Sequence, residues 1–162
     1  MKRHLAITAV MLLCSAVFFV VVSAGAGPVV PWKGTWEGGS NFIIPATNCP
    51  DGFNILAIAT GKGNMTLGGA SEWISTNCCE PTGHCVGTAI ITTANGDQIY
   101  LSLTHDFNPV SGDWIQNEEI IGGTGRFVGA TGESMSSGTS TVTGPTTDIW
   151  QGTNVGSLEF SF

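Results

Sequence analysis

The chain has 162 residues, of which 42% are hydrophobic and only 10% are charged, with 12 acidic residues against five Lys and Arg. An acidic surface repels phosphate backbones, which excludes nucleic acid as an expected partner. It also disfavours docking on anionic lipid, and we interpret the charge as an aid to solubility.

The first 26 residues have the three-part pattern of a secretory signal peptide. They open with Lys-Arg-His after the initial Met, continue with an apolar run over residues 5–22 and end with Ala-Gly-Ala at residues 24–26, a small-x-small cleavage site. Cleavage there leaves one domain, residues 27–162, with three basic and 12 acidic residues and a formal net charge of −9. The alternative is an uncleaved anchor, because the apolar run is only just long enough to span a bilayer. We expect a secreted or periplasmic protein with no stable membrane insertion after cleavage.

Four cysteines follow the leader, since Cys14 lies within its apolar run. They are Cys49, Cys78, Cys79 and Cys85. An even number of cysteines in an exported chain predicts two disulfides, and the sequence leaves their pairing open. Zinc is the alternative because His84 precedes Cys85, but the chain has no C-x-x-C spacing. We therefore expect disulfides, and neither a metal nor a cofactor.

The remaining residues predict β-strands and no helix, because short apolar stretches alternate with turn residues. The strongest hairpin covers residues 86–104, where Ile99, Leu101 and Leu103 face one side and Ala-Asn-Gly-Asp at residues 94–97 predicts a tight I′ turn. Gly-Lys-Gly at residues 61–63 is interpreted as the turn of a second hairpin, and residues 47–49 and 77–85 as loops that disulfides pin. The other expected strands cover residues 32–38, 54–60, 64–69, 114–121, 132–142, 149–153 and 155–162.

About eight or nine strands at this spacing predict an all-β sandwich or barrel. Closure is favoured because it satisfies the backbone groups of the two sheet edges, and glycines within strands allow the sharp coiling that a small barrel needs. These glycines are Gly34, Gly38, Gly87, Gly129, Gly132, Gly138 and Gly152. We predict a closed antiparallel barrel of about eight strands.

Residues 120–132 read I-I-G-G-T-G-R-F-V-G-A-T-G and predict a turn between two strands. The spacing from Gly123 is not G-x-G-x-x-G and no helix follows, which excludes a nucleotide loop. Phe127 is expected to plug one end of the barrel. The expected turn residues, which tolerate backbone angles closed to other residues or allow close packing, are Gly122, Gly123, Gly125, Gly129 and Gly132.

The pattern G-G-T-G-x-F-x-x-A-x-G in this segment resembles the signature of the dirigent and allene-oxide-cyclase barrel families. The Asn-Gly-Asp hairpin upstream and the Trp-Gln-Gly strand downstream are similar to small exported bacterial members of the group. The resemblance implies a calycin-like barrel of eight strands that shapes a bound ligand, as in radical coupling or ring closure in an apolar cavity. Because the glycine motif is structural in those families, no catalytic residue is carried over.

A candidate ligand pocket follows from the expected strand over residues 114–121. Trp114, Gln116 and Glu118 share one face, and if that face is internal, Trp114 and Glu118 line a pocket. The full set of expected pocket residues is Trp36, Trp114, Glu118 and Phe127. The chain also has Trp32, Trp73 and Trp150, which we interpret as core and rim residues, with carbohydrate stacking as the alternative.

Two pairs of polar residues are candidates for chemistry. Glu118 and Glu119 point to opposite faces, so at most one can enter a cavity and act as an acid or base there. We expect both near solvent, because Glu is seldom buried unpaired. His105 and Asp106 follow an expected strand, and a surface role in a loop is the interpretation.

These observations favour an exported scaffold or interaction protein that is not an enzyme. The alternative is a barrel that binds a small apolar molecule, with cyclase-like, isomerase-like or dirigent-like activity. A cavity lined by aromatics favours this alternative, and a barrel filled with side chains favours the scaffold. A small outer-membrane barrel is the third hypothesis, because Leu158, Phe160 and Phe162 alternate with polar residues. A barrel in water would instead turn Leu158 and Phe160 inward.

Overall fold

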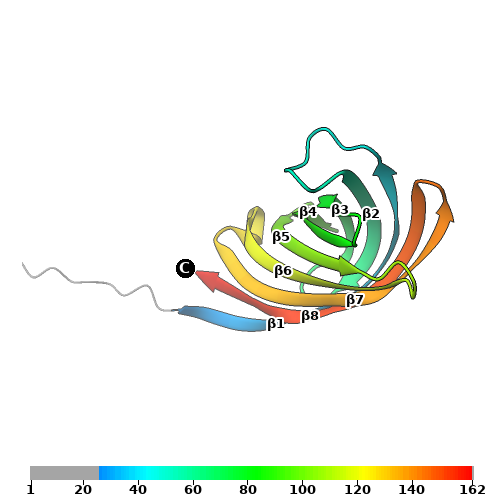
Figure 1. Ribbon diagram of the computed structural model, residues 1–162. Helices are drawn as coiled ribbons and strands as arrows, with labels where there is room; N and C mark the ends of the chain where they lie inside the picture. The colour runs from blue at the N-terminus through cyan, green and yellow to red at the C-terminus, as the bar shows by residue number, and fades with distance from the viewer. Residues whose placement is uncertain (1–25, 162) are drawn as a thin grey trace, which may run out of the picture.

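A computed structural model describes residues 26–161, which form a closed antiparallel barrel of eight strands (Figure 1). Each strand pairs with its neighbours in chain order, and β1 pairs with β8 to close the barrel. The elements are β1 (Ala26–Ile43), β2 (Ile55–Met65), β3 (Gly69–Cys79), β4 (His84–Thr93), β5 (Gln98–Phe107), β6 (Asp113–Gly123), the 3-10 turn η1 (Gly125–Phe127), β7 (Ala130–Gly144) and β8 (Thr147–Ser161). The predicted all-β barrel is confirmed. The leader prediction lies outside the described residues, apart from Ala26 at the start of β1.

The Gly-Lys-Gly segment is not a turn, because β2 runs straight through it. Gly61 pairs with Trp73 of β3, and the actual β2–β3 turn covers residues 66–68. A Cβ on Gly61 would lie 2.5 Å from Trp150 Cη2, and a Cβ on Gly63 would lie 2.3 Å from Trp36 Cε3. These glycines make room for indole rings inside the barrel, so the local turn signal was misleading.

Residues 77–85, expected as a loop, instead contain the end of β3, a short turn at residues 80–83 and the start of β4. Strand β3 is absent from the sequence-based strand set because much of its inner face is polar. Ser71, Ser75 and Asn77 are buried on that face. Likewise β8 is one strand, although two were expected, and buried Asn154 lies at the expected break.

The predicted hairpin over residues 86–104 is formed by β4 and β5, but its turn is not of type I′. That turn needs positive φ at two consecutive residues. Here Gly96 has a φ of 87°, and no residue other than glycine has positive φ among residues 26–161. The link is a longer loop over residues 94–97, closed by a 2.9 Å hydrogen bond from Thr93 N to Asp97 O.

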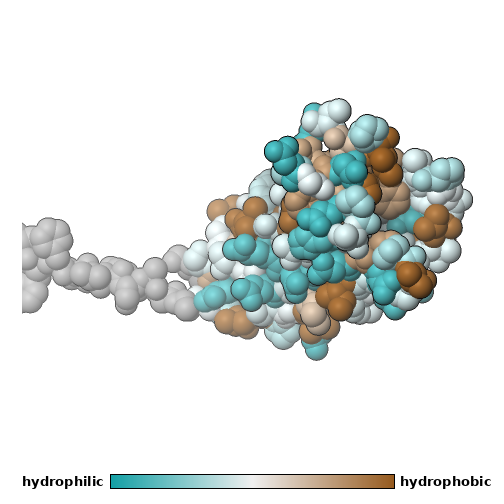
Figure 2. Space-filling view, viewed as in Figure 1, coloured by the Kyte–Doolittle hydropathy of each residue, from teal (hydrophilic) through white to brown (hydrophobic). Residues whose placement is uncertain are grey.

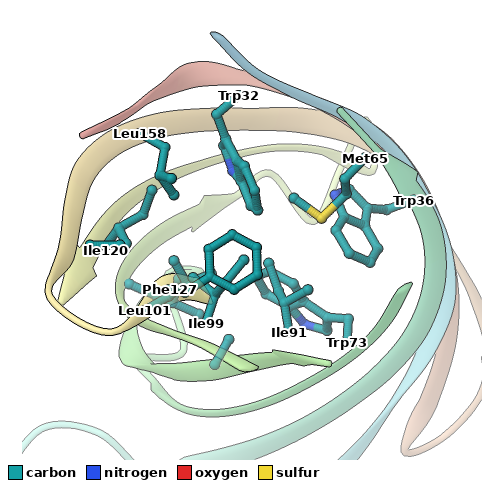
Figure 3. Close-up of a cluster of buried hydrophobic side chains, with 13 residues drawn as sticks. Trp32, Trp36, Met65, Trp73, Ile91, Ile99, Leu101, Ile120, Phe127 and Leu158 are labelled. Carbon is teal, nitrogen blue, oxygen red and sulfur yellow. The ribbon is translucent and has the colours of Figure 1, made fainter. Parts of the chain in front are cut away.

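The apolar core fills the end of the barrel that contains η1, which we call the closed end (Figure 3). Phe127 is fully buried, and its ring stacks on Phe160 with centroids 6.4 Å apart. The largest side chains with almost no exposure are Trp32, Phe127, Ile91, Ile99, Leu101, Ile120 and Leu158. The opposite end, with the loops at residues 44–54, 80–83, 108–112 and 145–146, is called the open end.

The side chains of the strands have the orientation predicted for a barrel in water. Leu158, Ile99 and Leu101 are fully buried, Phe160 packs against the core and Ser161 is exposed. The outer-membrane hypothesis predicted the reverse orientation for these residues. On the face shown in Figure 2, apolar side chains form separate patches between hydrophilic ones. No helix within residues 26–161 is long and apolar enough to cross a membrane.

The two predicted disulfides are formed. Cys49 bonds to Cys78, a sequence separation of 29, and ties the loop at residues 44–54 to the end of β3. Cys79 bonds to Cys85, a separation of six, across the β3–β4 turn. The four cysteines therefore bond to one another and not to zinc. Two disulfides indicate an oxidising, extracytoplasmic setting.

The glycine turn before β7 leads to a prediction about the stability of the barrel. Gly125 has a φ of 55°, and a Cβ there would lie 1.8 Å from Asp97 Oδ1, which would push Asp97 away from Arg126. Gly125→Val should therefore lower the free energy of unfolding by more than the roughly 1 to 3 kcal/mol that backbone strain alone costs. The matched control is Gly96→Val, which has positive φ but no heavy atom within 4 Å of the added Cβ. Urea unfolding measures both, and equal losses would contradict the contact with Asp97.

Candidate functional site

The core stops partway along the barrel and leaves a cavity at the open end. Its volume is about 310 Å³, and all eight strands contribute residues to its wall. The aromatic and polar residues of this lining include Trp36, Trp73, His105, Trp114, Gln116, Glu118, Ser136 and Trp150. Small-molecule sites have volumes of about 300 to 1,000 Å³, so the cavity has the size of a small ligand site.

Tryptophans form much of the apolar wall, and glycines on neighbouring strands make room for them. The ring of Trp114 on β6 lies across Gly138 of β7 and Gly152 of β8, where added Cβ atoms would lie 2.7 Å from Cζ2 and 2.5 Å from Cη2. A side chain at either position would meet the ring and also a backbone carbonyl oxygen, that of Gln151 or of Ser137. Gly138 and Gly152 therefore have a second role besides allowing the strands to coil, which is to let an indole ring lie against the wall.

Trp150 has the same arrangement one row further toward the open end. Its ring lies across Gly38 of β1 and Gly61 of β2, where added Cβ atoms would lie 2.6 Å from Cζ2 and 2.5 Å from Cη2. The rings of Trp114 and Trp150 meet edge to face, with centroids 6.4 Å apart and an interplanar angle of 89°. The indoles thus hold one another in fixed orientations around the cavity.

A buried carboxylate provides the polar part of the wall. Glu118 is only 4% exposed, whereas Glu119 points outward and is exposed. Gln116 Nε2 donates to Glu118 Oε1 at 2.9 Å, and the hydroxyls of Ser134 and Ser136 on β7 donate to the same carboxylate. The expectation that both glutamates lie near solvent is therefore wrong for Glu118. Three donors offset the cost of removing its charge from water.

His105, on β5, lies beside the Glu118 group. It pairs directly with Gln116 of β6, lines the cavity and stacks on Trp114 with ring centroids 5.8 Å apart and an interplanar angle of 23°. Burial lowers the pKa of His105 below 6.5, while the Gln116 hydrogen bond and the nearby Asp106 and Asp148 carboxylates oppose the shift. The imidazole is therefore neutral at neutral pH.

The expected surface role for the His105-Asp106 pair is wrong for His105 because β5 continues through both residues. Successive strand residues face opposite sides, so only one of the two can be outside. Asp106 is exposed and bonds His84 Nδ1 at 2.7 Å. Among residues 26–161, no group of three or more His, Cys, Asp or Glu side chains is arranged to hold a metal ion.

The sequence matches no protein-family model and no curated protein. A solved structure of the pterocarpan synthase dirigent protein GePTS1 is similar to this barrel, with a TM-score of 0.52 and 12% sequence identity. The similarity covers 83% of this chain and 87% of that chain. This chain shares the barrel fold of the dirigent proteins. At such low identity the likeness establishes the dirigent-type barrel and no activity.

Of the four residues expected to line a pocket in this dirigent-type barrel, Trp36, Trp114 and Glu118 lie at the cavity. Phe127 does not, because η1 folds it into the core at the closed end. Trp73 and Trp150 were assigned to core and rim, and the structure places both on the cavity wall.

Two further residues line the cavity: His105, which the sequence analysis assigns to a surface loop, and Ser136, which it does not name. A usable signal existed for His105, since the alternation of Ile99, Leu101 and Leu103 continues to it. None existed for Ser136, whose inward direction depends on the pairing of β7 with β6.

Proposed function

We propose that this protein binds a small, mainly apolar molecule inside the barrel. The observation that carries the proposal is the cavity of about 310 Å³, which remains although the closed end is densely filled. A scaffold protein has no need of such a space, because filling it with apolar side chains would add to stability.

The wall of the cavity supports a ligand with two distinct parts. Indole rings offer flat apolar surface, which suits an apolar or aromatic body. His105, Gln116 and the Glu118 group occupy one side and suit a single polar substituent. Few polar groups in a mostly apolar pocket are the usual arrangement for fixing the orientation of a ligand.

Binding of the neutral fluorescent probe N-phenylnaphthylamine tests the proposal. Ala59 faces the cavity from β2, and its neighbour Thr60 faces outward and is exposed. We expect saturable binding to the wild type, and Ala59→Phe should weaken it by about tenfold or more, or about 1.4 kcal/mol, because the new ring occupies the cavity. The matched control Thr60→Phe should bind the probe as the wild type does.

Two outcomes would contradict the proposal. One is a lack of saturable binding to the wild type, and the other is equal affinity for the wild type and Ala59→Phe. Either result would support the scaffold interpretation instead. Melting temperatures of the two variants verify that both are folded under the binding conditions.

A further inference from the structure

The polar side of the cavity contains a chain of hydrogen bonds in which the donor and the acceptor of each bond are fixed. Glu118 is its terminal acceptor, because a carboxylate accepts and does not donate. Ser134, Ser136 and the Gln116 amide nitrogen all donate to it. The Gln116 amide must therefore turn its nitrogen toward Glu118, which leaves its oxygen for the other neighbour.

That other neighbour is His105, the direct cross-strand partner of Gln116, and the two side chains hydrogen-bond. An amide oxygen only accepts, so the imidazole must donate a ring N–H to it. A neutral imidazole has a single N–H, and its second nitrogen is then an unprotonated acceptor. The stacked ring of Trp114 restricts the plane of the imidazole and thus the direction of that lone pair.

We propose that His105 is a general base for a ligand in the cavity, held in one tautomer by Gln116 and Glu118 as positioning residues. The inference rests on the proposed ligand-binding function. The fitting substrate class is an apolar molecule with a C–H bond beside a carbonyl group. The free ring nitrogen takes that proton, and the electron pair of the C–H bond moves to the carbonyl oxygen as an enolate. In a substrate whose enolate is conjugated with a second double bond, return of the proton at the far carbon of that bond gives an isomer and restores the neutral imidazole, without oxidant, reductant or co-reactant.

The charges around His105 suit a proton that is taken up and then released. Asp106 on the same strand and Asp148 on β8 both favour the imidazolium, while His84 on β4 opposes it. Glu118 on β6 acts through Gln116, whose amide oxygen continues to accept from the protonated ring. Burial keeps the resting ring neutral. A base that is neutral at rest and stabilised once protonated meets the requirement of general base catalysis.

NMR of the imidazole nitrogens in the ligand-free protein tests the positioning. In the wild type we expect one protonated and one bare nitrogen for His105, titrating below 6.5. Gln116→Leu should give a mixture of tautomers. The matched control is Asn117→Leu, which changes the exposed neighbour on β6 and should leave the spectrum of His105 unchanged. A mixture of tautomers in the wild type, or a single unchanged tautomer in Gln116→Leu, overturns the inference.

Ring opening of nitrobenzisoxazole, an apolar carbon acid, tests the base itself. A base removes its C–H proton, the N–O bond breaks and a coloured phenolate is released. We expect saturable turnover that rises with pH and levels off above the pKa of His105, because the neutral imidazole is the active form. His105→Gln should lower kcat by about 10² to 10⁴. Asn117→Leu, the matched control at the exposed neighbour on β6, should retain it. Gln116→Leu should lower kcat and leave KM within about twofold, as expected for lost positioning rather than lost binding.

The outcomes separate this inference from the proposed function. Saturable binding of nitrobenzisoxazole without turnover, or equal kcat in the wild type and His105→Gln, overturns the base and leaves ligand binding intact. Failure of both nitrobenzisoxazole and N-phenylnaphthylamine to bind overturns the ligand-binding function and the base with it.

Discussion

Phe127→Ala is expected to lower the free energy of unfolding by about 3 to 5 kcal/mol, the usual cost of removing a fully buried aromatic ring. Phe127 is 0% exposed, stacks on Phe160 and is covered by the guanidinium of Arg126, 5.0 Å from the ring centroid. Phe127 is the buried residue of η1, so its ring is the part of this turn that fills the closed end. Urea unfolding followed by circular dichroism measures the loss.

Val128→Ala is the matched control for this variant, because Val128 is the next residue and is 66% exposed. Its free energy of unfolding should change by less than about 0.5 kcal/mol. Under conditions where Phe127→Ala is folded, its affinity for N-phenylnaphthylamine should equal that of the wild type, because Phe127 does not line the cavity. A loss of stability below about 1 kcal/mol would show that the closed end repacks around the missing ring.

Removal of the Cys49–Cys78 disulfide by a double Cys→Ala substitution should cost about 3 to 4 kcal/mol. The bond closes a loop with a sequence separation of 29, and the entropy that it removes from the unfolded chain grows with the logarithm of loop length. The internal comparison is the Cys79–Cys85 bond, whose separation of six predicts a smaller loss of about 2 kcal/mol. Thermal unfolding of both double variants measures the order, and a larger loss for the shorter loop would contradict the entropic explanation.

Whether a strand could be predicted from the sequence depended on whether its inner face was apolar. Strand β5 was recognised because Ile99, Leu101 and Leu103 face the core and alternate with more polar residues. Strand β3 was missed because Ser75 and Asn77 face the cavity, where the usual rule of apolar inside and polar outside does not hold. The errors therefore concentrate around the cavity rather than the core.

The same reason explains which parts of the candidate site could be predicted from the sequence. Trp114, Gln116 and Glu118 could be placed on one face from the period of a strand alone. That Glu118 is buried could not be predicted, because its partners Ser134 and Ser136 lie on β7 and reach it only through the barrel pairing. The prediction of a turn at Gly61 is wrong for a related reason. The indole ring that occupies the space beside this glycine belongs to Trp150, which is far away in the sequence.

Because indole rings lie against wall glycines, the shape of the cavity depends on these glycines as well as on the residues that line it. Trp114 and Gly152 behave as one unit, because the ring of the first occupies the space that a side chain on the second would need. A methyl group added at residue 152 would press on this ring, which lines the cavity, and on the carbonyl oxygen of Ser137, without replacing any lining residue. Divergence among proteins of this architecture could therefore change the size of the cavity through single small residues on the wall.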